Sequence, residues 1–405
     1  MSSVCASKDM DAENLPKKRN VLFVIESLGC GGAEKSLVSL LALLDRQRYN
    51  LSIWIIHPEG AFMHLLPNDI QLVEQPKYNW FESLLVKFSS VVYSIVWRLN
   101  NMFGKKEYWG ETYYKCRGWT IKVPKGKWNV VLAYHQGLVT YIVADKFKGC
   151  KKVGWVNADI FKAGYNIKYN SRFYRKIDCI CLVSDILHKM MDERIPEFLG
   201  KYHTVWDIID PDLTRKLSVH PVKELKKSPK EFVFVTTGRL HALKGFDIAV
   251  EAARFLKNKG LSFKWYFIGE GAERNNIERM ISAYGLQDNV MLMGLQTNPY
   301  PYMAQADVYV QTSRHEGFGM TIAEAKILGL PIVTTNFDVV YNQIEHGKNG
   351  LVAEMDGEKV GEQILNLVQN DDVREQIRNA VLKEKNTTCK TEVKKVEEII
   401  DDLTS

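Results

Sequence analysis

Two glutamates lie eight residues apart in the stretch SRHEGFGMTIAEA, which covers residues 313–325. The segment MTIAEAKILG (320–329) has the pattern of a helix, so Glu324 falls in its first turns and Glu316 in the loop before it. A carboxylate near a helix start is stabilised by the helix dipole, which makes it a good acceptor for paired hydroxyls such as those of a sugar or a ribose. Helix capping alone explains Glu324 but leaves Glu316 without a role.

The residues between the two glutamates, Gly317, Phe318 and Gly319, form a glycine-flanked turn. Glycine lets the backbone come close to a ligand because no side chain stands in the way. We therefore expect the N–H groups of this turn to face the same ligand as the two carboxylates.

A second glycine-rich stretch, SLGCGGAEKS (27–36), stands between an apolar run and a helical pattern. The free N–H groups of a helix start attract a phosphate or another anion, so Gly31 and Gly32 are candidates for contact with a phosphorylated ligand. A tight turn without a ligand is the alternative for this segment.

A third stretch, TGRLHALKGFD (237–247), places Arg239 at the end of an apolar run and Lys244 five residues later, at a helix entry. A cation at a helix start opposes the helix dipole, which favours a bound anion between the two side chains. Both cations can converge on a pyrophosphate together with the N–H groups of the turn.

The elements that must position these residues follow an alternation of short apolar runs and helical patterns. In the first half the runs are NVLFVIES (20–27), LSIWIIHP (51–58), WNVVLAYH (128–135), KKVGWVN (151–157) and DCICLVS (178–184). In the second half they are EFVFVTTGRL (231–240), KWYFIGEG (264–271), NVMLMG (289–294), DVYVQTS (307–313) and LPIVTTN (330–336). The alternation predicts two doubly wound α/β domains, whose ligands bind in the crevice at the carboxyl ends of the strands.

The motifs together resemble those of retaining nucleotide-sugar glycosyltransferases with the GT-B fold, glycosyltransferase family 4 (group 1). Glu316 and Glu324 match the E-x7-E signature of that family, and GGAE (31–34), GR-x4-KG (238–245) and NGLVAE (349–354) occur in the same order as in the family. The resemblance extends over nearly the whole chain and is stronger in its C-terminal half.

The resemblance implies a role for each candidate. Glu324 would bind the ribose hydroxyls of the nucleotide, Glu316 would contact the donor sugar, and Arg239 with Lys244 would hold the diphosphate. The loop at Gly31 and Gly32 would sit across the crevice from the diphosphate, near the acceptor.

The domain boundaries follow from the segment SVHPVKELKKSPK (218–230), which carries two prolines and a lysine cluster without periodicity. We predict the following parts: a disordered tail (1–19), an N-terminal acceptor-binding Rossmann-like domain (20–210), a linker (211–230), a C-terminal nucleotide-sugar-binding Rossmann-like domain (231–385) and a C-terminal helix (386–405). The last helix is expected to pack back across the two domains, which face each other across the crevice.

One position departs from the pattern of the family. Members commonly carry a histidine after the strand that corresponds to KKVGWVNADI, whereas this chain has Asn157. An amide can hydrogen-bond a sugar hydroxyl but cannot carry a proton. Three options stay open: His135 takes part of the role, Asp159 does, or no protein base is needed because the leaving phosphate accepts the proton of the acceptor hydroxyl.

A metal site has little support in the sequence. The segment DPD (210–212) has the D-x-D form that some other glycosyltransferases use with a divalent cation, but it falls on the interdomain hinge, where Asp207 and Ile208 replace a usual Asn and Gly. The seven cysteines show no paired C-x-x-C spacing, which fits neither a zinc site nor a disulfide framework. We predict no required cofactor or metal, with Arg239 and Lys244 neutralising the diphosphate of the donor, preferably a UDP-sugar.

Charge is unevenly distributed along the chain, whose net charge is +6. Residues 83–178 hold 18 Lys or Arg against five Asp or Glu. Within them, the apolar stretch 83–103 is too broken by Lys87 and Arg98 to span a bilayer, and it is followed by Lys105, Lys106, Lys115, Arg117, Lys122, Lys125 and Lys127. An apolar stretch beside clustered cations can lie in an anionic headgroup layer. The alternative is a helix that packs into the N-terminal core and exposes a basic outer face.

The first twenty residues lack the apolar region of a secretory signal, so we expect a cytoplasmic protein, peripheral at the inner face of the membrane. Nucleic acid is not expected as a partner, because no recognised nucleic-acid fold accompanies the charge.

We expect transfer of a sugar from a nucleotide diphosphate to a saccharide or lipid-linked acceptor, with retention of configuration, in surface polysaccharide or glycan synthesis. The alternatives are a GT-B enzyme on soluble acceptors, an epimerase, or a non-catalytic nucleotide-sugar binder in a glycan assembly complex.

Overall fold

The computed structural model describes residues 18–29, 31–104, 107–222, 225, 228, 231–384 and 388–405. Most of the tail expected over 1–19, six positions of the expected linker, and both Lys105 and Lys106 of the basic cluster lie outside these ranges.

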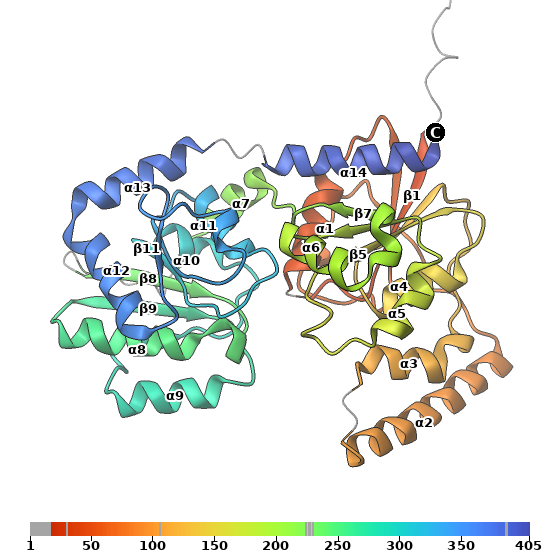
Figure 1. Cartoon of the computed structure of the whole chain (residues 1–405), viewed down its shortest axis with the longest axis horizontal. Coiled ribbons are helices and arrows are strands. Elements are labelled where there is room, and N and C mark those ends of the chain that lie inside the picture. Colours follow the sequence, from red (N-terminus) through yellow and green to blue (C-terminus); the bar gives the residue numbers. More distant parts are fainter. Residues whose placement is uncertain are drawn as a thin grey trace, which may run out of the picture.

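The first half of the chain folds around a parallel sheet (Figure 1). Its elements are β1 (Arg19–Ile25), α1 (Gly32–Leu43), β2 (Tyr49–Ile55), η1 (Met63–Leu65), β3 (Gln71–Leu72), α2 (Trp80–Met102), α3 (Trp109–Arg117), η2 (Gly118–Thr120), β4 (Val130–Ala133), α4 (Leu138–Lys146), β5 (Lys151–Val156), α5 (Ile167–Tyr174), β6 (Cys179–Leu182), α6 (Asp185–Arg194), η3 (Pro196–Lys201) and β7 (Tyr202–Thr204). In the described residues the strand order is β3-β2-β1-β4-β5-β6-β7.

The second half builds a second parallel sheet of the same kind. Its elements are α7 (Pro211–Ser218), β8 (Phe232–Thr237), η4 (Ala242–Lys244), α8 (Phe246–Asn258), β9 (Phe263–Ile268), α9 (Arg274–Ala283), β10 (Val290–Leu292), α10 (Tyr300–Ala304), β11 (Val308–Gln311), α11 (Met320–Ile327), β12 (Ile332–Thr335), η5 (Val340–Asn342), β13 (Leu351–Ala353), α12 (Gly357–Gln369), α13 (Asp371–Lys383) and α14 (Thr388–Thr404). In the described residues the strand order is β10-β9-β8-β11-β12-β13. The segment expected to be a linker therefore begins with a helix, α7.

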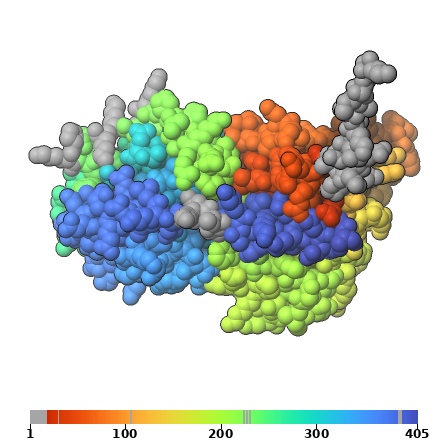
Figure 2. Space-filling view, turned by 90° about the horizontal axis from the view of Figure 1, so that it is seen from above, coloured from red at the N-terminus to blue at the C-terminus, as the bar shows by residue number. Residues whose placement is uncertain are grey.

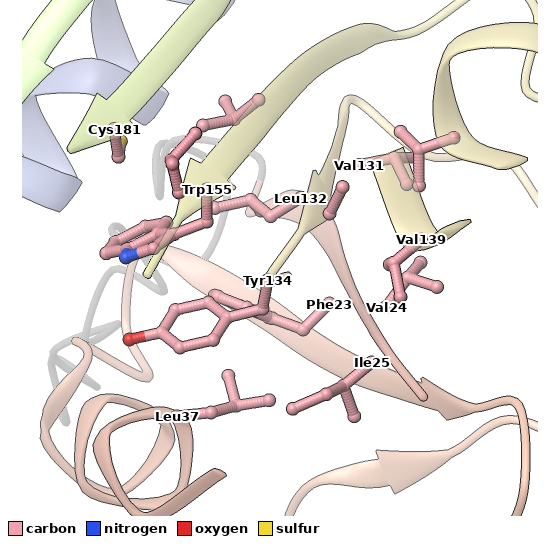
Figure 3. Close-up of a cluster of buried hydrophobic side chains, with 14 of the residues drawn as sticks. Phe23, Val24, Ile25, Leu37, Val131, Leu132, Tyr134, Val139, Trp155 and Cys181 are labelled. Atoms are coloured by element: carbon pink, nitrogen blue, oxygen red, sulfur yellow. The ribbon is translucent and has the colours of Figure 1, made fainter. Parts of the chain in front are cut away.

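The central strands form because their sequences are mostly apolar on both faces, as expected for parallel strands covered by helices on both sides. Four consecutive residues of β1, from Val21 to Val24, have no exposed surface. Figure 3 shows Tyr134, just beyond β4, against Trp155 of β5, and the two stacked rings lie 4.3 Å apart. This aromatic pair fixes the ends of the strands from which His135 and Asn157 follow.

The C-terminal helix α14 returns from the second domain to the first, as expected, and runs along the top of the molecule (Figures 1 and 2). Its apolar face enters the core of the N-terminal domain, where Val396 and Ile400 are buried. On its polar face, Glu397 accepts a hydrogen bond from Arg48 at 3.0 Å and Asp401 accepts one from Tyr49 at 2.8 Å. Helix α14 thus packs on the N-terminal domain although it follows the C-terminal domain in the sequence.

Candidate active site

The strand order reverses between β1 and β4 in one sheet and between β8 and β11 in the other. Ligands of doubly wound sheets bind at such switch points, outside the carboxyl ends of the strands. The candidate residues follow these strands: Gly31 comes after β1, His135 after β4, Arg239 after β8 and Glu316 after β11. The topology therefore explains why residues far apart in the sequence meet.

A cavity of about 440 Å³ occupies the crevice between the domains. Of the residues that the sequence singled out for the site, it brings together all except Asp159, namely Gly31, Gly32, His135, Asn157, Arg239, Lys244, Glu316, Gly317, Phe318, Gly319 and Glu324. A second cavity of about 320 Å³ shares Arg239 and Glu324 with it and extends to the loops after β9 and β10, where Glu270 and Gln296 line it. The two cavities together can hold an elongated ligand.

Glu316 is held by three donors and is only 10% exposed. One of its oxygens, Oε1, accepts hydrogen bonds from Gln311 Nε2 at 2.8 Å and Ser313 Oγ at 2.6 Å. Lys244 Nζ lies 2.7 Å from Oε1 and 2.6 Å from Oε2. The carboxylate is therefore fixed at the wall of the crevice by contacts within the protein.

The two cations expected at the diphosphate differ in their surroundings. Lys244 ends η4 and pairs with Glu316, whereas Arg239 is exposed at the crevice and has no carboxylate partner within 4 Å among the described residues. Gly245 follows with φ +62°, and a side chain there would place its Cβ 1.9 Å from the carbonyl oxygen of Thr312. The tight turn that presents Lys244 thus requires glycine.

Glu324 lies in α11 and is completely buried. Its Oε1 accepts hydrogen bonds from Lys35 Nζ at 2.6 Å and from the Tyr300 hydroxyl at 2.9 Å. Its Oε2 is buried and has no hydrogen-bond partner among the described residues. Lys35 belongs to α1, so this ion pair joins the two domains across the crevice.

The turn between the glutamates touches the opposite domain. A Cβ on Gly317 would lie 3.2 Å from the carbonyl oxygen of Asn157, and a Cβ on Gly32 would lie 2.7 Å from Met320 Sδ. Gly319 has φ +90° and begins α11, and Gln343 Nε2 donates to the Phe318 carbonyl oxygen at 2.6 Å. Glycine at these positions therefore permits the close approach of the domains.

The residues considered as a proton acceptor are placed differently. Asn157 Nδ2 donates to the Tyr134 carbonyl oxygen at 3.0 Å, which leaves Oδ1 buried without a described partner. Burial lowers the pKa of His135, and its ring lines the cavity, so the neutral imidazole is present at neutral pH. Asp159 accepts from the backbone N–H groups of Phe161 and Lys162 and does not line either cavity.

Asp210 of the D-x-D segment caps a helix. Its Oδ1 accepts from the N–H groups of Asp212 and Leu213 at 2.9 and 3.1 Å, at the start of α7. Across the described part of the chain, no group of three or more His, Cys, Asp or Glu side chains could hold a metal ion.

Asp207 is a crevice residue that the sequence marked only as a replacement in the hinge. It lines the larger cavity, and its Oδ1 is buried without a described partner. Burial raises the pKa of Asp207 to about 7, Ser36 opposes this shift, and Glu34 adds to it. The folded protein therefore keeps a proton on Asp207 that the unfolded chain releases near pH 4.

The change Asp207→Asn should stabilise the protein more at pH 8 than at pH 5. Between the two pKa values the unfolded state binds fewer protons, so the stability of the wild type falls as the pH rises through this window. The loss is at most about 4 kcal/mol above pH 7, or several degrees in Tm. Thermal unfolding of both proteins at the two pH values checks this, and an equal difference in Tm at pH 5 and pH 8 would contradict it.

Several residues of the site were not singled out from the sequence: Lys35, Tyr300, Gln311 and Ser313. Lys35 directly follows the GGAE stretch, and Gln311 and Ser313 end an apolar run, so position in the sequence offered a weak signal. Their partners are set by the fold, which sequence spacing does not show.

Comparisons with known proteins agree with this architecture. Residues 221–384 match the sequence model of the family described as glycosyl transferases group 1. An uncharacterized glycosyltransferase of Methanocaldococcus jannaschii is 27% identical over 166 residues, which cover 40% of this chain and 41% of that protein. A poly(ribitol-phosphate) alpha-N-acetylglucosaminyltransferase of Staphylococcus aureus is 30% identical over 168 residues, which cover 40% of this chain and 34% of that protein. The chain thus spans less than half the length of these two relatives.

A solved structure extends the likeness to nearly the whole chain. The protein HepE of Anabaena, solved in complex with UDP and glucose, has a TM-score of 0.67 at 16% identity and is covered over 100% of its length by 95% of this chain. Such a likeness concerns the fold. Two facing parallel-sheet domains and a C-terminal helix that crosses between them define the GT-B fold, as predicted.

Proposed function

We propose that the protein is a retaining glycosyltransferase of family 4 that moves a sugar from a nucleotide diphosphate, preferably UDP, to a saccharide or lipid-linked acceptor. The sugar would be a hexose or an N-acetylhexosamine, and the product a surface polysaccharide or another glycan. The observation that carries the proposal is the convergence in one crevice of two buried or nearly buried carboxylates and two cations.

Each part of the crevice suits a part of the donor. Arg239 can bind the diphosphate without first giving up a partner, and Lys244 can bridge the diphosphate and Glu316. The unpartnered Oε2 of Glu324 can accept from ribose hydroxyls, and the cavity beyond it, toward Gln296, can take the base. The relatives support the class of donor, because HepE was solved with UDP and glucose.

The proposed reaction breaks the bond between C1 of the donor sugar and the phosphate oxygen and forms a bond from C1 to an acceptor hydroxyl on the same face of the ring. The hydroxyl proton passes to the leaving phosphate oxygen, so no protein base is consumed. Positive charge grows on the sugar in the transition state, and Glu316 lies where it can stabilise that charge. His135 and the free Oδ1 of Asn157 are available to orient hydroxyls at the same wall.

A panel of UDP-, GDP-, ADP- and CMP-sugars, tested by thermal shift with and without EDTA, examines the donor directly. We expect one nucleotide-diphosphate sugar to raise Tm by several degrees in either condition, because a ligand that binds only the folded state stabilises it. Stabilisation by none of them, or only with a divalent cation, would contradict the proposed donor site.

We include in the proposal that the protein works at an anionic membrane, at its inner face, and that helix α2 makes the contact. Among the described residues no helix is long and apolar enough to cross a membrane. Helix α2 lies at the periphery of the N-terminal domain with α3 between it and the sheet (Figure 1). Its outer face exposes the side chains of Trp80, Phe81, Leu84, Phe88, Val91, Ile95, Leu99 and Met102.

These exposed apolar residues fall within an arc of about 100° when each residue turns the helix by 100°. Lys87 and Arg98 lie together along one edge of this stripe, and the single carboxylate of the helix, Glu82, points elsewhere and pairs with Lys122 at 2.5 Å. The outward side of α2 is thus mainly apolar with two cations at its edge, which supports a membrane contact over a helix with a basic outer face. An apolar stripe with cations beside it suits a helix that lies flat in an anionic headgroup layer.

The double change Phe88→Ser with Ile95→Ser should lower binding to anionic vesicles about 100-fold or more, since each buried apolar side chain contributes about 1.5 to 3 kcal/mol. Co-sedimentation with phosphatidylcholine vesicles that contain about a third phosphatidylglycerol measures this. The matched control is Val219→Ser with Leu382→Ser, two exposed apolar residues on the other side of the hinge. If both double variants bound anionic vesicles equally, α2 would not make the membrane contact. If the wild type bound uncharged vesicles as well as anionic ones, the proposed anionic surface would be contradicted.

A further inference from the structure

Only one of the two carboxylate oxygens of Glu324 accepts hydrogen bonds from the described residues. Its Oε1 has two donors, Lys35 at 2.6 Å and Tyr300 at 2.9 Å, whereas Oε2 has none among the described residues although it is fully buried. A buried carboxylate oxygen without a hydrogen bond is unfavourable unless a ligand completes it. Glu324 lines both cavities of the crevice, so a ligand there can reach it.

The cation that holds Oε1 comes from the opposite domain. Lys35 is in the first turn of α1, while Glu324 and Tyr300 belong to α11 and α10 of the C-terminal domain. Burial alone would lower the pKa of Lys35, but the nearby Glu324 and Tyr300 raise it above the ordinary value. Lys35 therefore stays charged in a site where its side chain is only 18% exposed.

The Lys35 side chain also has little freedom to move away from this position. Its Nζ lies 4.9 Å from the centre of the Tyr300 ring and 5.8 Å from that of Phe62. The ammonium is thus enclosed by two aromatic rings and one carboxylate. This enclosure holds the carboxylate in a single orientation, with Oε2 left for a ligand.

We infer that Lys35 is a positioning residue for the nucleotide. The N-terminal domain thus contributes Lys35 to a ribose site on the C-terminal domain. Lys35 and Tyr300 occupy Oε1 and thereby direct Oε2 toward the 2′ and 3′ hydroxyls of the ribose. The inference rests on the proposed function, because it requires a nucleotide in the crevice. It also implies that recognition of the ribose is complete only when the two domains are close enough for the Lys35–Glu324 pair to form.

A purely structural role would have a different signature. If Lys35 only tied the domains together, its loss would weaken every ligand of the crevice alike. If Lys35 orients Oε2 of Glu324, its loss reduces the gain in affinity that a nucleotide obtains from its ribose hydroxyls. The ratio of two affinities separates the roles, because general effects on stability or closure cancel in it.

The test is calorimetric titration of the full chain with UDP and with 2′,3′-dideoxy-UDP, for the wild type and Lys35→Met. We expect the wild type to prefer UDP by about 30-fold or more, and Lys35→Met to retain a preference of no more than about threefold. The matched control is Lys162→Met, which removes a cation that lies 3.8 Å from Asp338 across the same crevice, and it should keep the preference of the wild type.

The inference would be overturned if Lys35→Met preferred UDP over 2′,3′-dideoxy-UDP as strongly as the wild type does. This holds whether the two affinities are equally lowered or both unaltered, and the proposed nucleotide site would remain. A wild type that binds neither ligand would overturn the proposed function and the inference with it. If Lys35→Met does not fold, Lys35→Gln takes its place with the same expected loss of preference.

Discussion

Replacing Glu316 by Gln should lower kcat about 10²- to 10³-fold while the affinity for UDP stays the same or rises. The carboxylate is fixed by Ser313, Gln311 and Lys244 and carries negative charge at the wall where the donor sugar would lie. A prearranged charge that matches charge developing in the transition state is often the largest single contribution to catalysis. Gln is nearly isosteric but uncharged, so it would also release Lys244 to the diphosphate.

The Glu316→Gln experiment compares initial rates of UDP release with calorimetric affinities for UDP. The control Glu345→Gln removes an exposed carboxylate of the same domain that pairs with Lys348 and should leave both values unchanged. If Glu316→Gln retained full turnover, Glu316 would not take part in the reaction and a binding protein would be the better description.

Replacing Glu324 by Gln should weaken UDP binding about 100-fold. Two hydrogen bonds from ribose hydroxyls to a charged acceptor contribute about 1.5 kcal/mol each, or about 3 kcal/mol together. The same change leaves Lys35 partly buried without its counter-charge, so the Tm should also fall, because an unpaired buried charge costs about 3 kcal/mol.

The two effects of Glu324→Gln are measured separately, by calorimetric titration below the transition temperature and by thermal unfolding without ligand. The double variant Lys35→Met with Glu324→Gln should recover part of the lost Tm, since neither buried charge remains, but none of the UDP affinity. UDP binding as tight as in the wild type would place the ribose elsewhere.

Local patterns predicted the two α/β domains and ten of the thirteen strands in the described part of the sheets, but not the short strands β3, β7 and β13. β1 is apolar from Val21 to Ile25 and β8 from Phe232 to Val235, and each is followed by a helix start, which is a signal within a dozen residues. The candidate site followed from the same logic, because Arg239, Glu316 and Gly31 all come directly after such runs. Residues that share the carboxyl edge of a sheet can be grouped without knowing any long-range contact.

The pairings inside the site could not be predicted, because they depend on how the two domains face each other. Lys35 and Glu324 are separated by 289 positions, and nothing in their local sequences indicates that they meet. The same holds for Lys244, which the sequence assigned to the diphosphate with Arg239 and which the structure pairs with Glu316.

The orientation of α2 could not be predicted from the sequence either. An apolar stretch with two charges fits a buried helix and a surface helix equally, because both have one apolar face. The packing of Tyr93 on Tyr113 of α3, with ring centres 5.3 Å apart, and the burial of Ser89 show which face turns inward.

The most direct test of the glycosyltransferase assignment is UDP release by the purified full chain, measured with a panel of UDP-sugars and anionic lipid extract in the presence of EDTA. We expect release with at least one UDP-sugar, transfer of the sugar to lipid or saccharide, and a loss of both in Glu316→Gln, as the glycosyltransferase assignment requires. Release that is absent with every sugar, or that persists unchanged in Glu316→Gln, would contradict it.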